Sequence, residues 1–146
     1  LHRAVYNAMV ASGLKLRNYG TVVVSVADED KEETLPLVRR FYNMGFNIEA
    51  TTVTGEFLKA NGIRTRIRHK PSEGSQEILD SIRAGYVSYV INTRAILSGK
   101  HYGDGIAIRQ CTAQNNIAML TSLDTVRMLL DVLEEVTFGI STIDGR

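Results

Sequence analysis

Residues 21–31, with the sequence TVVVSVADEDK, constrain the fold more than any other stretch of the chain. Residues 21–26 favour an extended strand and are interrupted only by Ser25, and four charged residues then lead into a helical pattern. A buried strand that ends in a polar turn and feeds a helix is typical of a parallel α/β sheet. Because ligands bind beyond the carboxyl ends of such strands, this stretch predicts both a fold and the place of a site.

Composition narrows the class of protein. The 146 residues, 44% hydrophobic and 23% charged, predict one globular domain. A net charge of +1 argues against nucleic acid as a partner. The single cysteine, Cys111, excludes an internal disulfide and fits a reducing compartment, so we expect a cytoplasmic protein. No apolar run approaches the ~18 residues of a membrane span, so no membrane partner is expected.

The chain divides into three expected parts. Residues 1–12 have the apolar spacing of an amphipathic helix, and position 1 is not Met. We therefore expect a piece of a longer chain, in which residues 1–19 are a helix and linker from a preceding domain. Residues 20–136 are expected to form the domain itself, and residues 137–146 a C-terminal tail.

Strand and helix patterns alternate five times within the central part. The expected strands are residues 21–26, 46–50, 63–69, 87–91 and 117–120. The expected helices run to residue 44, over 55–60, 75–84 and 105–115, and onward from a cap at residue 122. Short connections between them predict one five-stranded parallel sheet with helices on both faces. The Arg-rich third strand is expected at an edge.

Local signals predict how the helices begin. Asp30 and Glu33 have the spacing of a capping box, and Pro36 requires either an irregular first turn or a start nearer Thr34. Thr54 and Ser122 are expected to cap the helices that follow them. The acidic run 28–30 is expected to be a solvated turn.

Small polar and cationic residues follow every expected strand. They are Asp28 to Lys31; Thr51, Thr52 and Thr54; His69, Lys70 and Ser72; Asn92, Thr93 and Arg94; and Thr121 with Ser122. The carboxyl ends of parallel strands lie along one rim, where helix N-termini also point. Hydroxyls, amides and a few cations near helix N-termini suit a phosphate-bearing ligand.

Simpler structural interpretations of the same residues stay open on the sequence alone. The threonines are common turn and cap residues, Lys31 is commonly solvated, and Lys70 in a Pro/Ser/Glu/Gly loop is typical of an exposed lysine. His69 has no metal-ligand neighbours in sequence, and Cys111 suits a core position. We find no nucleotide fingerprint, Walker lysine, Ser/His/Asp set or metal cluster, so we expect no catalytic residues, metal or cofactor in this chain.

Several motifs together resemble the C-terminal allosteric domain of the carbamoyl phosphate synthetase large chain. In order they read SVADEDKEETLPLVRRFYNMGF, EATTVTGEFLKANGI, HKPSEGSQEILDSIRAGYVSYVINTR, DGIAIRQCTAQNNI and TSLDT, within residues 20–133. The resemblance implies a methylglyoxal-synthase-like fold with an effector pocket at the strand ends. It also implies that a nucleotide monophosphate such as UMP or IMP binds there.

Matching the motifs implies which residues bind the effector. These are Ser25, Lys31, Thr51, Thr54, Lys70, Asn92 and Thr93, with Arg94 standing where a third hydroxyl is common. Thr121 matches a position for a second effector, ornithine. Met119 stands where ornithine-responsive members carry tyrosine, so we expect nucleotide control. Ser75 and Gln76 replace a usual Arg-Pro pair, which removes one expected cation.

The resemblance further implies a parent enzyme. That parent is an ATP-dependent ligase, with magnesium or manganese, which makes carbamoyl phosphate from bicarbonate and glutamine-derived ammonia for arginine or pyrimidine synthesis. Its partners are the synthetase domains of the same chain and a glutaminase small subunit. This fragment itself would be regulatory.

Two alternatives remain. The same fold is used by methylglyoxal synthase, a lyase that acts on a triose phosphate and needs carboxylates in the loops after strands three and four. Here residues 72–76 contain only Glu73, and residues 92–97 contain no acid. The other alternative is an interaction module whose pocket is vestigial.

Overall fold

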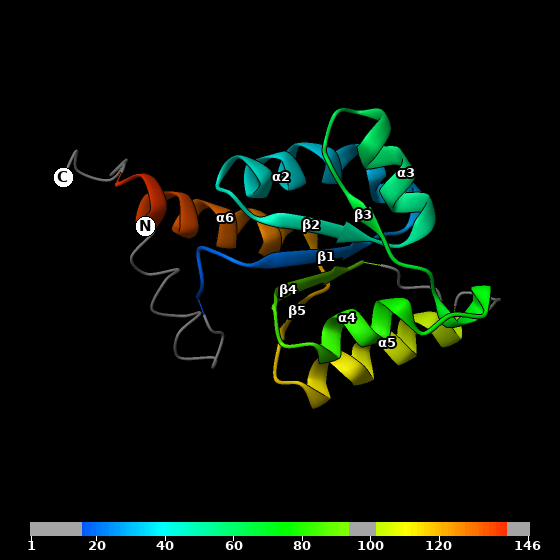
Figure 1. Cartoon of the computed structure of the whole chain (residues 1–146). Coiled ribbons are helices and arrows are strands. Elements are labelled where there is room, and N and C mark those ends of the chain that lie inside the picture. Colours follow the sequence, from blue (N-terminus) through cyan, green and yellow to red (C-terminus); the bar gives the residue numbers. More distant parts are fainter. Residues whose placement is uncertain (1–15, 94–101, 140–146) are drawn as a thin grey trace.

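A computed structural model describes residues 16–93 and 102–139, and these contain a five-stranded parallel sheet. The strands are β1 (Thr21–Ser25), β2 (Asn47–Ala50), β3 (Arg66–Ile67), β4 (Val87–Asn92) and β5 (Ala118–Leu120). Their spatial order is β3-β2-β1-β4-β5, and every neighbouring pair is parallel (Figure 1). The predicted fold class is therefore confirmed, including the edge position of the third strand.

Helices cover both faces of the sheet. They are η1 (Asp28–Asp30), α2 (Lys31–Asn43), α3 (Thr52–Ala60), η2 (Pro71–Glu73), α4 (Glu77–Arg83), α5 (Tyr102–Gln114) and α6 (Leu123–Phe138), where η marks a 3₁₀ turn. In Figure 1, α2, α3 and α6 lie on one side of the sheet, and α4 and α5 lie on the other. None of the helices in the described segments is long and apolar enough to cross a membrane.

The alternation of β1 side chains builds two hydrophobic cores. Val22 and Val24 pack into the cluster formed with α2, α3 and α6, whereas Val23 packs into the cluster formed with α4 and α5. All three valines are fully buried. Successive side chains of a strand point to opposite faces, so a strand with helices on both sides is apolar throughout.

The third strand is much shorter than the predicted range 63–69. Only Arg66 and Ile67 pair with β2, and the irregular stretch before them is bridged by the Thr65 hydroxyl, which donates to the Ile63 carbonyl at 3.0 Å. Close packing of α3 then holds β3 in place. A Cβ on Gly55 would lie 2.6 Å from Cγ1 of Ile67, so only glycine allows this approach.

The predicted helix starts were right in one case and wrong in two. The Ser122 hydroxyl accepts from Asp124 N at 3.2 Å and caps α6. The capping box at Asp30 does not form, because the η1 turn leaves Asp30 in a helical rather than an extended backbone conformation. Thr54 caps nothing, since α3 already begins at Thr52.

Helix α2 begins at Lys31, so the predicted alternative of a start near Thr34 is wrong. Pro36 lies inside the helix, and the irregular first turn expected from it is not present, because residues 31–34 are already α-helical. Helix α6 continues to Phe138, two residues into the stretch assigned to the tail. The predicted helix 1–12, Arg94 and residues 140–146 lie outside the described residues.

Candidate functional site

Five of the predicted ligand residues lie together at the carboxyl ends of three strands and the loop after a fourth. They are Ser25, Thr51, Thr54, Lys70 and Asn92, which we call the strand-end site, and all five are buried. Ser25 ends β1 and is in register with Asn92, which ends β4. The chain order reverses between these two strands, which is where α/β sheets bind ligands.

Hydroxyl groups line the end of β1. The Thr51 hydroxyl donates to Ser25 Oγ at 3.1 Å, and Thr54 Oγ1 accepts from Val26 N at 3.3 Å. Thr93 Oγ1 accepts from Ala27 N, also at 3.3 Å, so it ties the end of β4 to β1. Thr54 therefore points inward from the first turn of α3, although the predicted cap was wrong. The N-terminus of α3 adds partial positive charge here.

Lys31 lies in the first turn of α2, at the end of the helix dipole that disfavours a cation. Its ammonium lies 2.9 Å from Oδ1 of Asp28, a carboxylate that is largely exposed. The acidic turn is solvated as predicted, and it also holds the lysine. Because Asp28 is 80% exposed, water screens the pair from one side, and Lys31 can exchange this partner for another anion.

Lys70 differs from its simplest sequence interpretation, because it is only 7% exposed. Its Nζ atom lies 3.7 Å from Oδ2 of Asp104, which is equally buried in the first turn of α5. The simpler interpretation of Lys70 as an exposed loop lysine is therefore wrong. Asp104 was missed altogether, since its helix was expected to start at residue 105, three residues after its observed start at Tyr102, and no local motif marks it.

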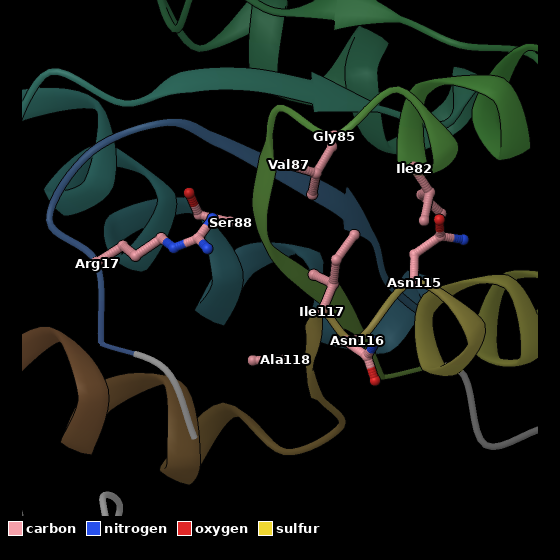
Figure 2. A pocket seen from close by; sticks show the side chains of 9 residues that line it. All are labelled: Arg17, Ile82, Gly85, Val87, Ser88, Asn115, Asn116, Ile117 and Ala118. Atoms are coloured by element: carbon pink, nitrogen blue, oxygen red, sulfur yellow. The ribbon is translucent and has the colours of Figure 1, made fainter. Parts of the chain in front are cut away.

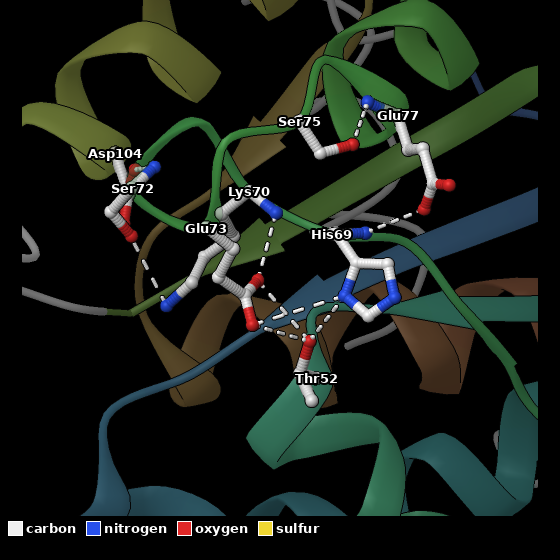
Figure 3. Close-up of polar contacts among 8 residues, drawn as sticks. All are labelled: Thr52, His69, Lys70, Ser72, Glu73, Ser75, Glu77 and Asp104. Carbon is white, nitrogen blue, oxygen red and sulfur yellow. Dashed lines mark hydrogen bonds and ion pairs between the residues drawn. The ribbon is translucent and has the colours of Figure 1, made fainter.

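The Glu73 carboxylate joins the η2 turn to the first turn of α3 (Figure 3). Its carboxylate accepts from Lys70 N and from the Thr52 hydroxyl, both at 2.9 Å. Burial acts to raise the pKa of Glu73, but these hydrogen bonds and the charges of Lys70 and His69 outweigh it and lower that pKa below its usual value. Glu73 is therefore ionised at neutral pH.

His69 lies beside Thr52 and Glu73. Its Nδ1 atom lies 3.1 Å from the Thr52 hydroxyl and 3.8 Å from Oε2 of Glu73.

Thr121, the candidate for a second effector, is exposed beyond β5 and is separated from β1 by β4. In the described residues, no group of three or more His, Cys, Asp or Glu side chains is placed to hold a metal ion.

Two hollows lie toward the amino ends of the strands, and the second extends past β3 as far as Arg68. One, of about 140 Å³, is lined by residues that include Arg17, Ser88 and Asn115 (Figure 2). The other, of about 920 Å³, runs along the starts of β1 and β2 and past β3. We call it the arginine groove; its defining residues are Arg64, Arg66, Arg68, Glu49 and Tyr86.

The arginine groove contains a closed polar network. Arg68 Nε donates to Oε1 of the buried Glu49 at 3.0 Å, and the Tyr86 hydroxyl donates to Oε2 at 2.8 Å. The hydrogen bond to Glu49 raises the pKa of Arg68, which stays fully charged. In the sequence, the only signal for this region was the alternation of arginines over residues 63–69, which predicted a strand at the edge of the sheet with one solvent-exposed side.

Comparison with known proteins identifies the family. A family model described as "MGS-like domain" matches residues 33–121, more than half of the chain. The chain belongs to the MGS-like domain family. The matched stretch includes four of the five strand-end residues, whereas Ser25 precedes it.

Solved structures show the same fold. Methylglyoxal synthase from Elizabethkingia anophelis NUHP1 is 19% identical, with a TM-score of 0.66 over 79% of each chain. A protein named ForH is 18% identical, with a TM-score of 0.61 over 82% of each chain. At these identities the likeness shows the MGS-like fold and nothing about the ligand.

Proposed function

We propose that this MGS-like domain binds a nucleotide monophosphate of the UMP or IMP class at the strand-end site. We propose further that it regulates a carbamoyl phosphate synthetase large chain. The observation that carries the proposal is the burial of Lys70 in the loop after β3, at the same edge of the sheet as the hydroxyl and amide side chains of the strand-end site. A buried ammonium is costly without an anionic partner, and at 3.7 Å Asp104 attracts Lys70 without a direct hydrogen bond, which supports the proposal that a phosphate makes the direct contact.

The surrounding groups match a phosphate rather than a metal or an apolar ligand. Thr51, Ser25 and Asn92 offer hydroxyl and amide groups, and the N-terminus of α3 favours an anion. Lys31 lies at the start of α2, beside the acidic turn that follows β1, and it supplies a second cation. From the motif match, Thr93 is a further candidate for contact with the phosphate or ribose, and Arg94 for additional charge on the phosphate.

Regulation requires that the effector bind two states of the parent unequally. A coupling free energy of ~1–3 kcal/mol is typical. In this proposal ATP, its magnesium or manganese, and a glutaminase small subunit belong to the other parts of the ligase. The domain itself contributes binding and no chemical step.

Isothermal titration of the protein with UMP, IMP and inorganic phosphate tests the binding proposal. Uridine is the matched control, because it lacks the phosphate. We expect UMP or IMP to bind and uridine to bind far more weakly. Absence of binding by both nucleotides at millimolar concentration would contradict the proposal.

A second candidate is a lyase that acts on a triose phosphate. It is favoured by two carboxylates, those of Glu73 and Asp104, which both lie near Lys70. Both carboxylates already accept hydrogen bonds, and the lowered pKa of Glu73 makes it a weak base, which disfavours proton transfer. Methylglyoxal production from dihydroxyacetone phosphate, absent in Glu73→Gln, would support this candidate instead.

A further inference from the structure

One carboxylate oxygen of Asp104 is shared between a hydroxyl and an ammonium (Figure 3). Oδ2 accepts from the Ser72 hydroxyl at 2.6 Å and lies 3.7 Å from Nζ of Lys70. The other oxygen, Oδ1, accepts from Ser72 N at 3.0 Å. Asp104 thus joins the η2 turn after β3 to the first turn of α5, directly beside the strand-end site.

The two distances describe different interactions. A hydroxyl that donates to a carboxylate at 2.6 Å makes a short, charge-assisted hydrogen bond. The Lys70 ammonium at 3.7 Å is beyond the ~2.7–2.9 Å of such a bond, so Asp104 attracts it mainly through charge. Lys70 can therefore turn toward a new anion without breaking a direct hydrogen bond to Asp104.

A phosphate bound to Lys70 would be repelled by the carboxylate of Asp104. It would lie on the order of 6 Å from Oδ2, and both charges are buried, where screening by water is weak. Asp104 therefore opposes phosphate binding in two ways: it attracts the lysine away, and it repels the incoming anion. The Ser72 hydroxyl reduces both effects, because it neutralises part of the charge on Oδ2.

We propose that Asp104 is a positioning residue that limits the phosphate affinity of the strand-end site, and that Ser72 adjusts this limit. The inference rests on the proposed function, because it assumes that Lys70 receives a phosphate. In the absence of phosphate, Asp104 keeps the buried ammonium charged and held near the rim. When phosphate binds, the ammonium exchanges its attraction to Asp104 for a direct contact with the phosphate.

The inference makes two variants change affinity in opposite directions. Asp104→Asn removes the competing charge, so inorganic phosphate and UMP should bind about tenfold more tightly. Ser72→Ala removes the hydroxyl that shares Oδ2, so Asp104 should attract Lys70 more strongly and affinity should fall about threefold. A role confined to holding the η2 turn against α5 would weaken binding in both variants.

The experiment is titration of each variant with inorganic phosphate and with UMP at low and high salt, with the melting temperature recorded. Ser75→Ala is the matched control, because Ser75 lies in the same loop and its hydroxyl accepts from Glu77 N instead of contacting Asp104. We expect wild-type affinity in this control. The gain in Asp104→Asn should shrink at high salt, since it arises from charge.

The outcomes separate this inference from the proposed function. If wild type binds and Asp104→Asn binds no more tightly, the inference about Asp104 is overturned and nucleotide binding stands. Weaker binding in both Asp104→Asn and Ser72→Ala also overturns it. If neither wild type nor Asp104→Asn binds phosphate or UMP, both proposals fail. Should Asp104→Asn not fold, an unchanged or increased affinity in Ser72→Ala is sufficient to overturn the inference.

Discussion

The strand-end site and the arginine groove are both cationic, yet they differ in how the charge is held. The strand-end site places Lys70 out of water, 3.7 Å from Asp104, at the sheet edge that also carries hydroxyls and the N-terminus of α3. In the groove, Arg64 and Arg66 are exposed, and their side chains form no ion pair within residues 16–93 and 102–139. Arg68 donates directly to its carboxylate partner Glu49 at 3.0 Å, whereas Lys70 lies 3.7 Å from Asp104.

The difference shows that the number of positive charges is a poor guide to an anion site. Exposed guanidinium groups lose little by staying hydrated, and a paired one has no charge to spare. A buried lysine at the ends of parallel strands is costly unless an anion or carboxylate accompanies it. Burial and neighbouring donors, rather than basic residues alone, distinguish the two regions.

The strongest test of this comparison is Lys70→Met, which keeps the side-chain length and removes the charge. We expect a loss of about 100-fold in affinity for UMP, because a charge-assisted contact to phosphate disappears from a buried site. The matched control is Arg66→Met in the groove, for which we expect unchanged affinity. Equal losses in the two variants, measured by calorimetric titration, would remove the distinction between the regions.

We expect the polar network of the arginine groove to stabilise the fold rather than to bind the ligand. Glu49→Gln leaves Arg68 and Tyr86 without their buried carboxylate, and we expect a loss of about 2 kcal/mol in the free energy of unfolding. The affinity for UMP should not change, because the Glu49 carboxylate is bound to Arg68 and Tyr86 in the groove rather than directed at the strand-end site. Urea denaturation and titration of the same variant measure the two quantities. A changed affinity with intact stability would reverse the assignment.

A smaller effect is expected from Thr51→Val, which keeps the shape of the side chain. Loss of the hydroxyl that bonds Ser25 should reduce UMP affinity about fivefold, equivalent to one hydrogen bond of ~1 kcal/mol. Thr112→Val is the matched control, because Thr112 is equally buried but donates within α5 to the Ile108 carbonyl. That control should alter stability alone. Unchanged binding in Thr51→Val would exclude its hydroxyl as a ligand.

The smallest expected effect is the contribution of Glu73 to the pH dependence of stability. The pKa of Glu73 is lower in the folded state than in the unfolded chain, so its contribution to stability is present above the unfolded pKa. That contribution is lost as the pH falls through the folded pKa. Glu73→Gln should therefore be slightly less stable than wild type near pH 7, and the difference should vanish at low pH. Melting temperatures measured between pH 7 and pH 3 test this, and a constant difference would contradict it.

Sequence patterns predicted much of the fold because they report local physics. The unbroken apolar run of β1 requires helices on both faces, and both cores are present. The Ser122 cap depends on a neighbouring N–H and was also predicted correctly. The capping roles of Asp30 and Thr54 failed, because the η1 turn and an earlier start of α3 place these residues differently.

The sequence alone was enough to predict a parallel sheet and to identify the residues that follow its strands. Strand ends of a parallel sheet share one edge, so a one-dimensional pattern is sufficient for that prediction. Only the tertiary structure decided that Lys70 is buried and that Asp104 lies beside it. These two residues are far apart along the chain, and burial and electrostatic pairing depend on which distant segments pack together.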